Sequence, residues 1–198
     1  EEALGRSFKP LKSIKGKVFA CLGNHDYETL DRVRRALADN DVVLLEDEEA
    51  IVDTRVGPVQ IIGSIFTFSG TEGSERHIVE LRQKYPRRAN VPRIMLIHNP
   101  SVFPMIPHGE VDIQFSGHYH GGQISLFGIV TFMELFVAMR HLFYKWKGQR
   151  DTRQFPDNGL YCLGKNRLYA HRGTGHYGFP LRLGVPSEQS LIRLHFSP

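Results

Sequence analysis

The sequence predicts an α/β fold whose strands pair in more than one way. Short apolar runs at 17–22, 42–45 and 93–97 alternate with segments of helical periodicity at 27–38 and 74–85. The C-terminal part is richer in strand patterns, which indicates mixed rather than purely parallel pairing. With 198 residues, 41% of them hydrophobic, the chain can bury a core, and its length fits a single domain.

The first half of the chain alternates between strands and helices. A connector from Leu11 leads to the strand 17–22, which stops at the turn Gly23-Asn24-His25-Asp26. The helix 27–38 places its apolar residues on one face, namely Leu30, Val33 and Leu37. Turn formers end that helix, a short strand follows at 42–45, and Gly57-Pro58 predicts a hairpin between the apolar runs 50–53 and 59–62.

The second half begins with a loop at 63–73 that is rich in Gly, Ser and Thr. The helix 74–85 follows, with Ile78 and Leu81 facing inward, and the buried strand 93–97 ends at His98-Asn99-Pro100. The apolar run 111–115 predicts a strand that ends at His118, and further strands are expected at 167–170 and 191–196.

Charge and cysteine content restrict the function only loosely. The formal net charge of +4 permits a phosphate-bearing partner or an anionic membrane but does not require one. Cys21 and Cys162 lie in apolar surroundings, which favours buried free thiols over a disulfide. No signal peptide or membrane-spanning stretch is visible, and the first residue is Glu1 rather than methionine, so we expect an upstream piece to be missing.

Histidines stand where three of the predicted strands end. His118 and His120 follow one strand, and residues two apart in an extended strand point the same way. An isolated pair of this kind is more typical of ordinary surface or core histidines. However, His25 and His98 also follow apolar runs, and strands of one sheet can bring their ends together. With the amide of Asn24, these imidazoles predict a site for a transition metal such as Mn, Fe or Zn.

His25 and Asp26 favour a second role at the same place. A carboxylate next to an imidazole orients the ring and favours its protonated form. His25 can then act as a general acid toward a leaving oxygen, with metal-activated water as the nucleophile. The alternative for His25 alone is a cap on the helix that follows. Because none of these strand-end positions is a cysteine, a structural zinc finger is not expected.

In combination, Gly-Asn-His-Asp at 23–26, His-Asn-Pro at 98–100 and Gly-His-Tyr-His-Gly-Gly-Gln at 117–123 resemble the calcineurin-like metallophosphoesterase superfamily. The chain is most similar to a bacterial membrane-associated branch with the motif Gly-His-Thr-His-Gly-Gly-Gln, one subgroup of which is the UDP-2,3-diacylglucosamine pyrophosphatases. The resemblance implies a four-layer αββα sandwich of two mixed sheets, with 1–198 as one domain that lacks its N-terminal strands. It also implies a phosphoesterase or pyrophosphatase with two divalent metal ions.

The resemblance implies a role for each motif residue. Asn24, His98 and His118 would hold one metal and His120 the other. The general acid would be His25 with help from Asp26. Gln123 and Arg182 would bind substrate. Arg182 lies in a glycine-rich segment with Arg172, where the alternative to phosphate binding is a loop that closes the sheet.

The sequence also departs from the family pattern. The family's Asp-x-His and Gly-Asp motifs, which supply the remaining ligands of the first metal, do not precede Gly23. This absence puts the activity of these residues alone in doubt. We expect the natural chain to extend upstream by about 30 or more residues, with two more strands beside 17–22. Tyr119 replaces the usual threonine of the branch and is expected to point away from the metals.

A helical segment at 131–147 forms an amphipathic insertion. It combines an aromatic, apolar stripe with Arg140, His141, Lys145 and Lys147 on the other side. This pattern fits a core-facing helix or a helix that lies in a membrane interface. With the resemblance, it predicts a lipid-linked or membrane-proximal substrate, a cytoplasmic protein that lies peripherally on the inner face of the membrane, and no nucleic-acid partner. The alternatives are a non-catalytic scaffold with an incomplete metal centre and a soluble nucleotide phosphodiesterase.

Overall fold

The computed structural model describes residues 2–14, 18–55, 57–126, 130–147, 156–176, 178 and 180–195. Within these ranges the α-helices are α1 (Glu2–Phe8), α2 (Leu30–Ala38), α3 (Gly70–Lys84) and α4 (Phe132–Trp146). The 3₁₀ helices are η1 (Lys9–Ile14), η2 (Asn24–Thr29), η3 (Pro100–Met105) and η4 (His120–Gly122). The strands are β1 (Phe19–Ala20), β2 (Val43–Leu44), β3 (Glu48–Thr54), β4 (Gly57–Gly63), β5 (Arg93–Leu96), β6 (Ile113–Ser116), β7 (Ser125–Leu126), β8 (Val130–Thr131), β9 (Gly159–Leu163) and β10 (Asn166–Ala170).

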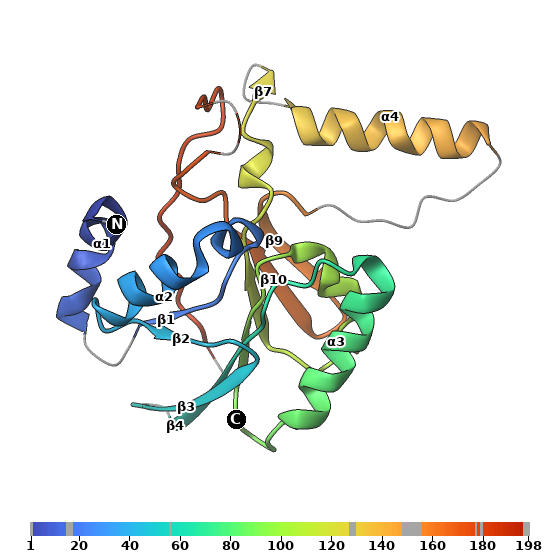
Figure 1. Ribbon diagram of the computed structural model, residues 1–198. Coiled ribbons are helices and arrows are strands. Elements are labelled where there is room, and N and C mark those ends of the chain that lie inside the picture. The colour runs from blue at the N-terminus through green and yellow to red at the C-terminus, as the bar shows by residue number, and fades with distance from the viewer. Residues whose placement is uncertain are drawn as a thin grey trace.

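A mixed six-stranded sheet with the order β3-β4-β5-β6-β10-β9 forms the centre of the fold. The pairs β4–β5, β5–β6 and β6–β10 are parallel, whereas the outer pairs β3–β4 and β10–β9 are antiparallel. Figure 1 shows α1, α2 and the parallel pair β1–β2 on one side of this sheet and α3 on the other. The predicted α/β class and mixed pairing are therefore confirmed.

Two apolar clusters hold these layers together. One lies between α3 and the sheet and consists of Ile62, Ile78, Leu81, Met95, Ile97, Val102, Ile106 and Val111. The other joins α2 to β1 and β2 through Leu22, Val33, Leu37 and Val42. The inward positions predicted for both helices are thus confirmed, with Leu30 only partly buried. Among the described strands, β1 pairs with β2 alone.

Several predicted elements have different bounds or are wrong. The helix expected at 74–85 begins earlier, at Gly70, and η2 precedes α2 where one continuous helix was expected. Residues 191–195 form no strand, because this segment runs along the surface with Leu191 fully exposed; Phe196 and Lys17 lie outside the described residues. The connector expected near Leu11 is helical, and β9 was not predicted. Cys162 is exposed rather than buried, and both cysteines are free thiols.

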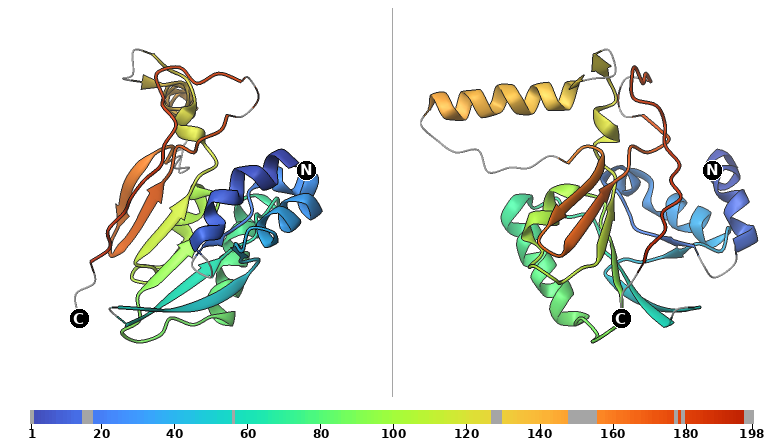
Figure 2. Two further views of the ribbon diagram at one scale, coloured as in Figure 1. Left: turned by 90° about the vertical axis from the view of Figure 1, so that its left-hand side faces the viewer. Right: turned by 180° about the vertical axis from the view of Figure 1, so that it is seen from behind.

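Helix α4 extends beyond the six-stranded sheet in Figures 1 and 2. Its first turn is fixed by a capping box: Thr131 Oγ1 accepts from the Glu134 backbone N–H, and the Thr131 N–H donates to the Glu134 carboxylate. Most of its described apolar side chains are exposed, by fractions that range from 41% at Leu135 to 80% at Trp146. The core-facing alternative therefore does not hold for the described side chains of this helix. Within the described ranges, every helix falls short of the length and hydropathy that a bilayer span requires.

Candidate metal centre

One edge of the six-stranded sheet collects the candidate site. Because β4, β5, β6 and β10 run parallel, their carboxyl ends lie at the same edge. The segments after these strands carry Phe66, His98, His118 and Arg172 respectively. The turn after β1 brings Asn24 to the same place, since its side chain contacts both His98 and His118.

Asn24, His98 and His118 form a compact cluster of three donor groups. Asn24 Oδ1 lies 3.1 Å from His98 Nε2 and 3.2 Å from His118 Nδ1. The two imidazole rings meet edge to face, with their centroids 5.1 Å apart. Two donors on one ion at about 2.1 Å are about 3.0 Å apart at a right angle and about 3.4 Å apart at a tetrahedral angle. The observed separations therefore match neighbouring ligands of a single metal ion.

Burial keeps these imidazoles neutral, as metal ligands must be. Burial, reinforced by the neighbouring His118, lowers the pKa of His98 to about 3. The pKa of His118 is lowered by burial and then by His120 and His25. Burial and the charge of Arg182 also lower the pKa of His120. Each ring therefore keeps a lone pair for a cation at neutral pH.

The His98 ring is held between a glycine and an aromatic ring. A Cβ atom on Gly23 would lie 2.8–3.0 Å from three atoms of this ring, so only glycine leaves the space that His98 occupies. Phe66 packs against both imidazoles, with centroid distances of 5.9 Å to His98 and 5.6 Å to His118. The Gly117 N–H donates to the His98 carbonyl and ties the two loops together. Sequence patterns did not identify Phe66, because a single aromatic residue in a Gly/Ser/Thr-rich loop carries no periodic signal.

The turn at 117–123 does not continue the extended strand that was expected. β6 ends at Ser116, and His118, His120 and Gln123 have φ angles of 74°, 53° and 56°. The alternation argument for His118 and His120 is therefore wrong. Gly121 and Gly122 also have positive φ, and a Cβ at either position would clash with Arg172 or Thr131. A tight left-handed turn, rather than strand pleating, places these histidines.

His120 contains a buried polar atom without a partner. Among the described residues, its Nδ1 is buried and makes no hydrogen bond, an arrangement that normally costs free energy. A cation would supply the missing partner. The described residues do not place any three His, Cys, Asp or Glu side chains as a metal-holding group, so the cluster consists of two imidazoles and one amide, with His120 nearby.

The carboxylate that contacts His25 is that of Glu28. His25 Nδ1 lies 2.6 Å from Glu28 Oε1, one helical turn further along η2. Asp26 instead accepts a hydrogen bond from the Gly23 N–H at 2.7 Å, which stabilises the turn that carries Asn24. Glu28 therefore has the orienting position that the sequence assigned to Asp26. The i, i+3 spacing of His25 and Glu28 was the signal that could have identified it.

The C-terminal tail binds the 117–123 turn through Arg182. The guanidinium of Arg182 donates to backbone carbonyl oxygens of His120, Arg172, Gly175, Val185 and Pro186. Gln123 is bridged to the tail by its carbonyl, which accepts from the Leu183 N–H. Arg172 pairs with Glu188, and hydrogen bonds from Ser190, Tyr169 and Arg172 outweigh the effect of burial and hold the pKa of Glu188 at about 2. Both arginines thus have contacts that organise the tail.

Tyr119 lies between the two motif histidines and is half-buried. Its hydroxyl is 2.6 Å from Ser101 Oγ in η3, while its ring lies against His118 with centroids 4.9 Å apart. The Asn99 side chain accepts from the Ser101 N–H and caps the same helix. Tyr119 therefore supports one face of His118.

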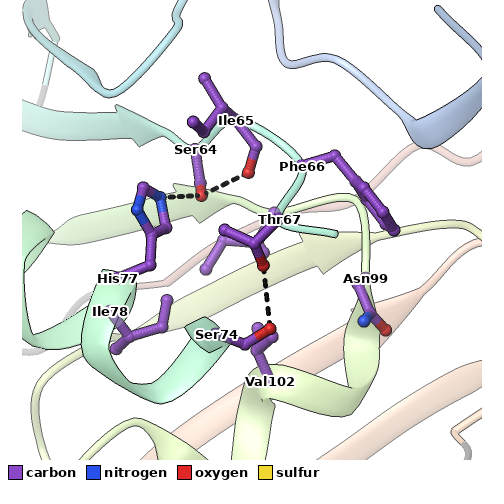
Figure 3. Close-up of a pocket in the computed structure, with 10 residues that line it drawn as sticks. Ser64, Ile65, Phe66, Thr67, Ser74, His77, Ile78, Asn99 and Val102 are labelled. Carbon is purple, nitrogen blue, oxygen red and sulfur yellow. Dashed lines mark hydrogen bonds between the residues drawn. The ribbon is translucent and has the colours of Figure 1, made fainter. Parts of the chain in front are cut away.

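A second cluster, Ser64, His77 and Asp47, resembles a nucleophilic triad only in composition. Ser64 Oγ and Asp47 Oδ1 both approach the same nitrogen, His77 Nε2, at 3.2 Å and 3.0 Å. A catalytic histidine needs the two partners on different nitrogens. The cavity beside this cluster, shown in Figure 3, holds about 10 Å³, which is enough for one water and not for a substrate.

Comparisons with known proteins agree with the motif analysis. The chain is 32% identical over 186 residues to YkoQ, an uncharacterized metallophosphoesterase of Bacillus subtilis, covering 92% of this chain and 61% of the relative. It is 26% identical to an uncharacterized metallophosphoesterase of Helicobacter pylori J99, covering 93% of this chain and 44% of the relative. It is 25% identical to the phosphodiesterase YaeI of Escherichia coli, covering 89% of this chain and 57% of the relative.

The chain spans about 60% or less of the length of these relatives. No protein-family model and no solved structure matches it. The similarity nevertheless extends over about nine tenths of the chain. The predicted resemblance is therefore confirmed: over most of its length, the chain is similar to proteins named metallophosphoesterases and to a phosphodiesterase.

Proposed function

We propose that the protein is a metal-dependent phosphoesterase or pyrophosphatase whose centre is the cluster of Asn24, His98 and His118. The observation that carries this proposal is the spacing of the three donor atoms, 3.1 Å and 3.2 Å around Asn24 Oδ1. When bound, divalent ions such as Mn, Fe or Zn supply Lewis acidity, activating water and neutralising phosphate charge. His120, with its unpartnered Nδ1, is the ligand available for a second ion.

The chain's own residues handle the proton and the substrate. His25 is exposed at the start of η2, and its Nδ1–H donates to Glu28, so that in the protonated imidazole Nε2 carries the proton that a leaving oxygen needs, and the neutral Nδ1–H tautomer remains after the transfer. Asp26 holds the turn that carries Asn24 and His25. Gln123 and Arg182 place the turn and the tail beside the site, and any contact they make with a phosphate adds to that role.

The rival hypothesis is a non-catalytic scaffold, and metal binding separates the two. We expect His118→Ala to lower two quantities in the natural polypeptide that carries these residues. One is the metal content after dialysis against Mn²⁺ or Zn²⁺, and the other is the rate of hydrolysis of bis(p-nitrophenyl) phosphate. His108→Ala removes an exposed histidine elsewhere and serves as the matched control. Unchanged metal content in His118→Ala, or metal binding without hydrolysis in the natural polypeptide, would favour the scaffold.

The substrate class also extends to lipid-linked or membrane-proximal phosphoesters of the UDP-diacylglucosamine kind, with α4 as the membrane contact. The apolar face of α4 is exposed, with Leu142 at 67% and Trp146 at 80%. Arg140 and Lys147 lie over aromatic rings of the same helix, so cations flank this face. Such a helix suits the interface of an anionic membrane. Its N-cap residue, Thr131, contacts the metal-site turn, because a Cβ on Gly122 would lie 2.6 Å from Thr131 Cβ.

Vesicle sedimentation tests this contact. We expect binding to phosphatidylglycerol vesicles that weakens with salt, and its loss in a Leu142→Ser, Trp146→Ser double variant. Leu191→Ser, which removes a fully exposed apolar side chain from the tail, is the control. If the α4 double variant sediments with vesicles as well as the wild type does, α4 is not the membrane contact, and a soluble nucleotide phosphodiesterase becomes the better hypothesis.

A further inference from the structure

A row of aromatic rings leads from the metal-site imidazoles to the protein surface. Phe66 packs against His118 at 5.6 Å and His98 at 5.9 Å. Phe68 follows at 4.9 Å from Phe66, and Tyr27 meets Phe68 edge to face at 5.4 Å and 87°. Phe66 is half-buried, whereas 68% of Phe68 is exposed. The row therefore has one end at the candidate site and the other end in solvent.

The loop that carries these rings is fixed along its backbone. The N–H of Ser64 donates to the Leu96 carbonyl at 3.0 Å, and the N–H of Ile65 donates to Asp47 Oδ1 at 3.0 Å. The N–H of Phe66 donates to the hydroxyl of Tyr27 at 3.3 Å. Three successive amides are thus anchored to three different segments, which holds the loop in one conformation before any ligand binds.

Side chains on the other face of the loop add to this order. Ser64 Oγ lies 3.2 Å from His77 Nε2, and Thr67 Oγ1 lies 2.8 Å from Ser74 Oγ. Figure 3 shows these groups turned toward α3, with the Phe66 ring directed away from them. The loop therefore presents polar side chains to α3 and aromatic rings to the metal site.

A single exposed phenylalanine is common on protein surfaces and needs no explanation. Phe68 differs because it continues a ring-to-ring series that starts at two candidate metal ligands. Tyr27 belongs to η2, the same short helix that carries Asn24 and His25. One helix therefore supplies a metal donor, the general acid and one wall of the aromatic row. A group attached to a phosphate at the cluster would have these rings beside it.

We propose that Tyr27, Phe66 and Phe68 form a subsite for a flat aromatic group carried by the phosphoester substrate. The proposal rests on the function proposed above, because it places the phosphate at the Asn24–His98–His118 cluster. Edge-to-face packing of Phe68 on Tyr27 and Phe66 leaves much of the Phe68 ring free to pack against a ligand ring. A nucleobase or another aryl group has the required shape and polarisability.

Binding of matched phosphonates to the Mn²⁺-loaded protein tests the subsite without requiring turnover. We expect (1-naphthylmethyl)phosphonate to bind about two- to tenfold more tightly than methylphosphonate, the factor that corresponds to one aromatic pair. Phe68→Ala should abolish this preference without changing methylphosphonate affinity or thermal stability, whereas Phe68→Tyr should retain it. Trp146→Ala, which removes a more exposed ring on α4, should have no effect.

The outcomes separate the subsite from the proposed function. If Phe68→Ala still prefers the naphthyl compound as the wild type does, the subsite is overturned. The subsite is also overturned if the wild type binds octylphosphonate as tightly as the naphthyl compound, because that result indicates a general apolar surface. Failure of both methyl and naphthyl compounds to bind the metal-loaded wild type overturns the proposed function, and the subsite falls with it. If Phe68→Ala loses the naphthyl preference but binds methylphosphonate as tightly as the wild type does, the subsite is supported and the metal centre is intact.

Discussion

Gly23 sets the position of His98, and replacing it with alanine should weaken metal binding. The added Cβ would lie 2.8 Å from His98 Cε1, 2.9 Å from Nε2 and 3.0 Å from Nδ1, whereas ordinary contact begins at 3.4 Å. Relief of the closest contact requires the ring to move by about 0.6 Å. The same movement along the Nε2–Oδ1 direction would lengthen the 3.1 Å separation from Asn24 to about 3.7 Å, beyond hydrogen-bond range.

A displacement of this size exceeds the roughly 0.5 Å within which a site's groups must be held. Changes to residues that orient metal ligands typically cost 10–100-fold in metal affinity, so we expect a loss of about that size in Gly23→Ala. The backbone itself is not strained, because Gly23 has φ −94° and ψ 172°, values that alanine also adopts. The effect should therefore come from the side-chain contact with His98 alone.

Gly117→Ala is the matched control, because it faces the same ring from a greater distance. Its Cβ would lie 3.9 Å from His98 Cε1 and Nδ1, in ordinary contact. Titration calorimetry with Mn²⁺ or Zn²⁺ measures the metal affinities of the wild type and both variants. Thermal unfolding of the same three proteins shows whether their stabilities differ. Equal affinities in Gly23→Ala and the wild type would refute the reasoning, and so would equal losses in both alanine variants.

Two further predictions concern chemistry and pH. In the natural polypeptide, His25→Asn should lower turnover by about 10²–10⁴-fold with metal content unchanged, whereas His118→Ala should lose metal and activity together; equal metal loss in both would show that His25 is a ligand. For Asp47 and His77, urea unfolding between pH 3 and 8 should show a contribution that Asp47→Asn removes. The hydrogen bond that His77 donates to the Asp47 carboxylate outweighs burial and raises the pKa of His77. This stability is therefore present below pH 6.5 and lost as the pH rises through the folded pKa. Burial opposes ionisation of Asp47, but hydrogen bonds from His77 and the Ile65 backbone outweigh burial and lower the pKa of Asp47. The stability that Asp47 contributes is therefore lost as the pH falls below 3.8. If the stability of Asp47→Asn depends on pH in the same way as that of the wild type, the pairing is contradicted.

The sequence predicted the strands that local pattern defines. The runs around β4, β5 and β6 are apolar and bounded by turn residues, and their neighbours in the sheet follow from parallel connection through helices. The 191–196 segment had a similar composition but no partner strand to pair with in its described part, so composition alone was misleading. β9 was missed because its three central residues are exposed in succession, so the strand has no alternation of buried and exposed positions.

The candidate site was predictable as a set of residues but not as a geometry. His98 and His118 follow neighbouring parallel strands, so their meeting at one sheet edge could be expected from topology, whereas Asn24 follows β1, which lies outside that sheet. The exchange of Asp26 for Glu28 beside His25 depends on η2: once residues 24–29 are known to be helical, the i, i+3 spacing identifies Glu28, but the predicted helix began only at Tyr27. Contacts between distant segments were equally hidden, because they depend on how the chain packs after the strands are formed.

The 117–123 turn is where these separate contacts meet, and its backbone explains why. Positive φ at His118, His120 and Gln123 costs about 1–3 kcal/mol each, and glycine at these positions would avoid the cost. Such strain persists only where surrounding contacts hold it. Arg182 binds the His120 carbonyl, Gly121 packs on Arg172, and Gly122 packs on Thr131 at the start of α4. The tail and the start of α4 therefore stabilise the conformation that turns the imidazole of His118 toward Asn24.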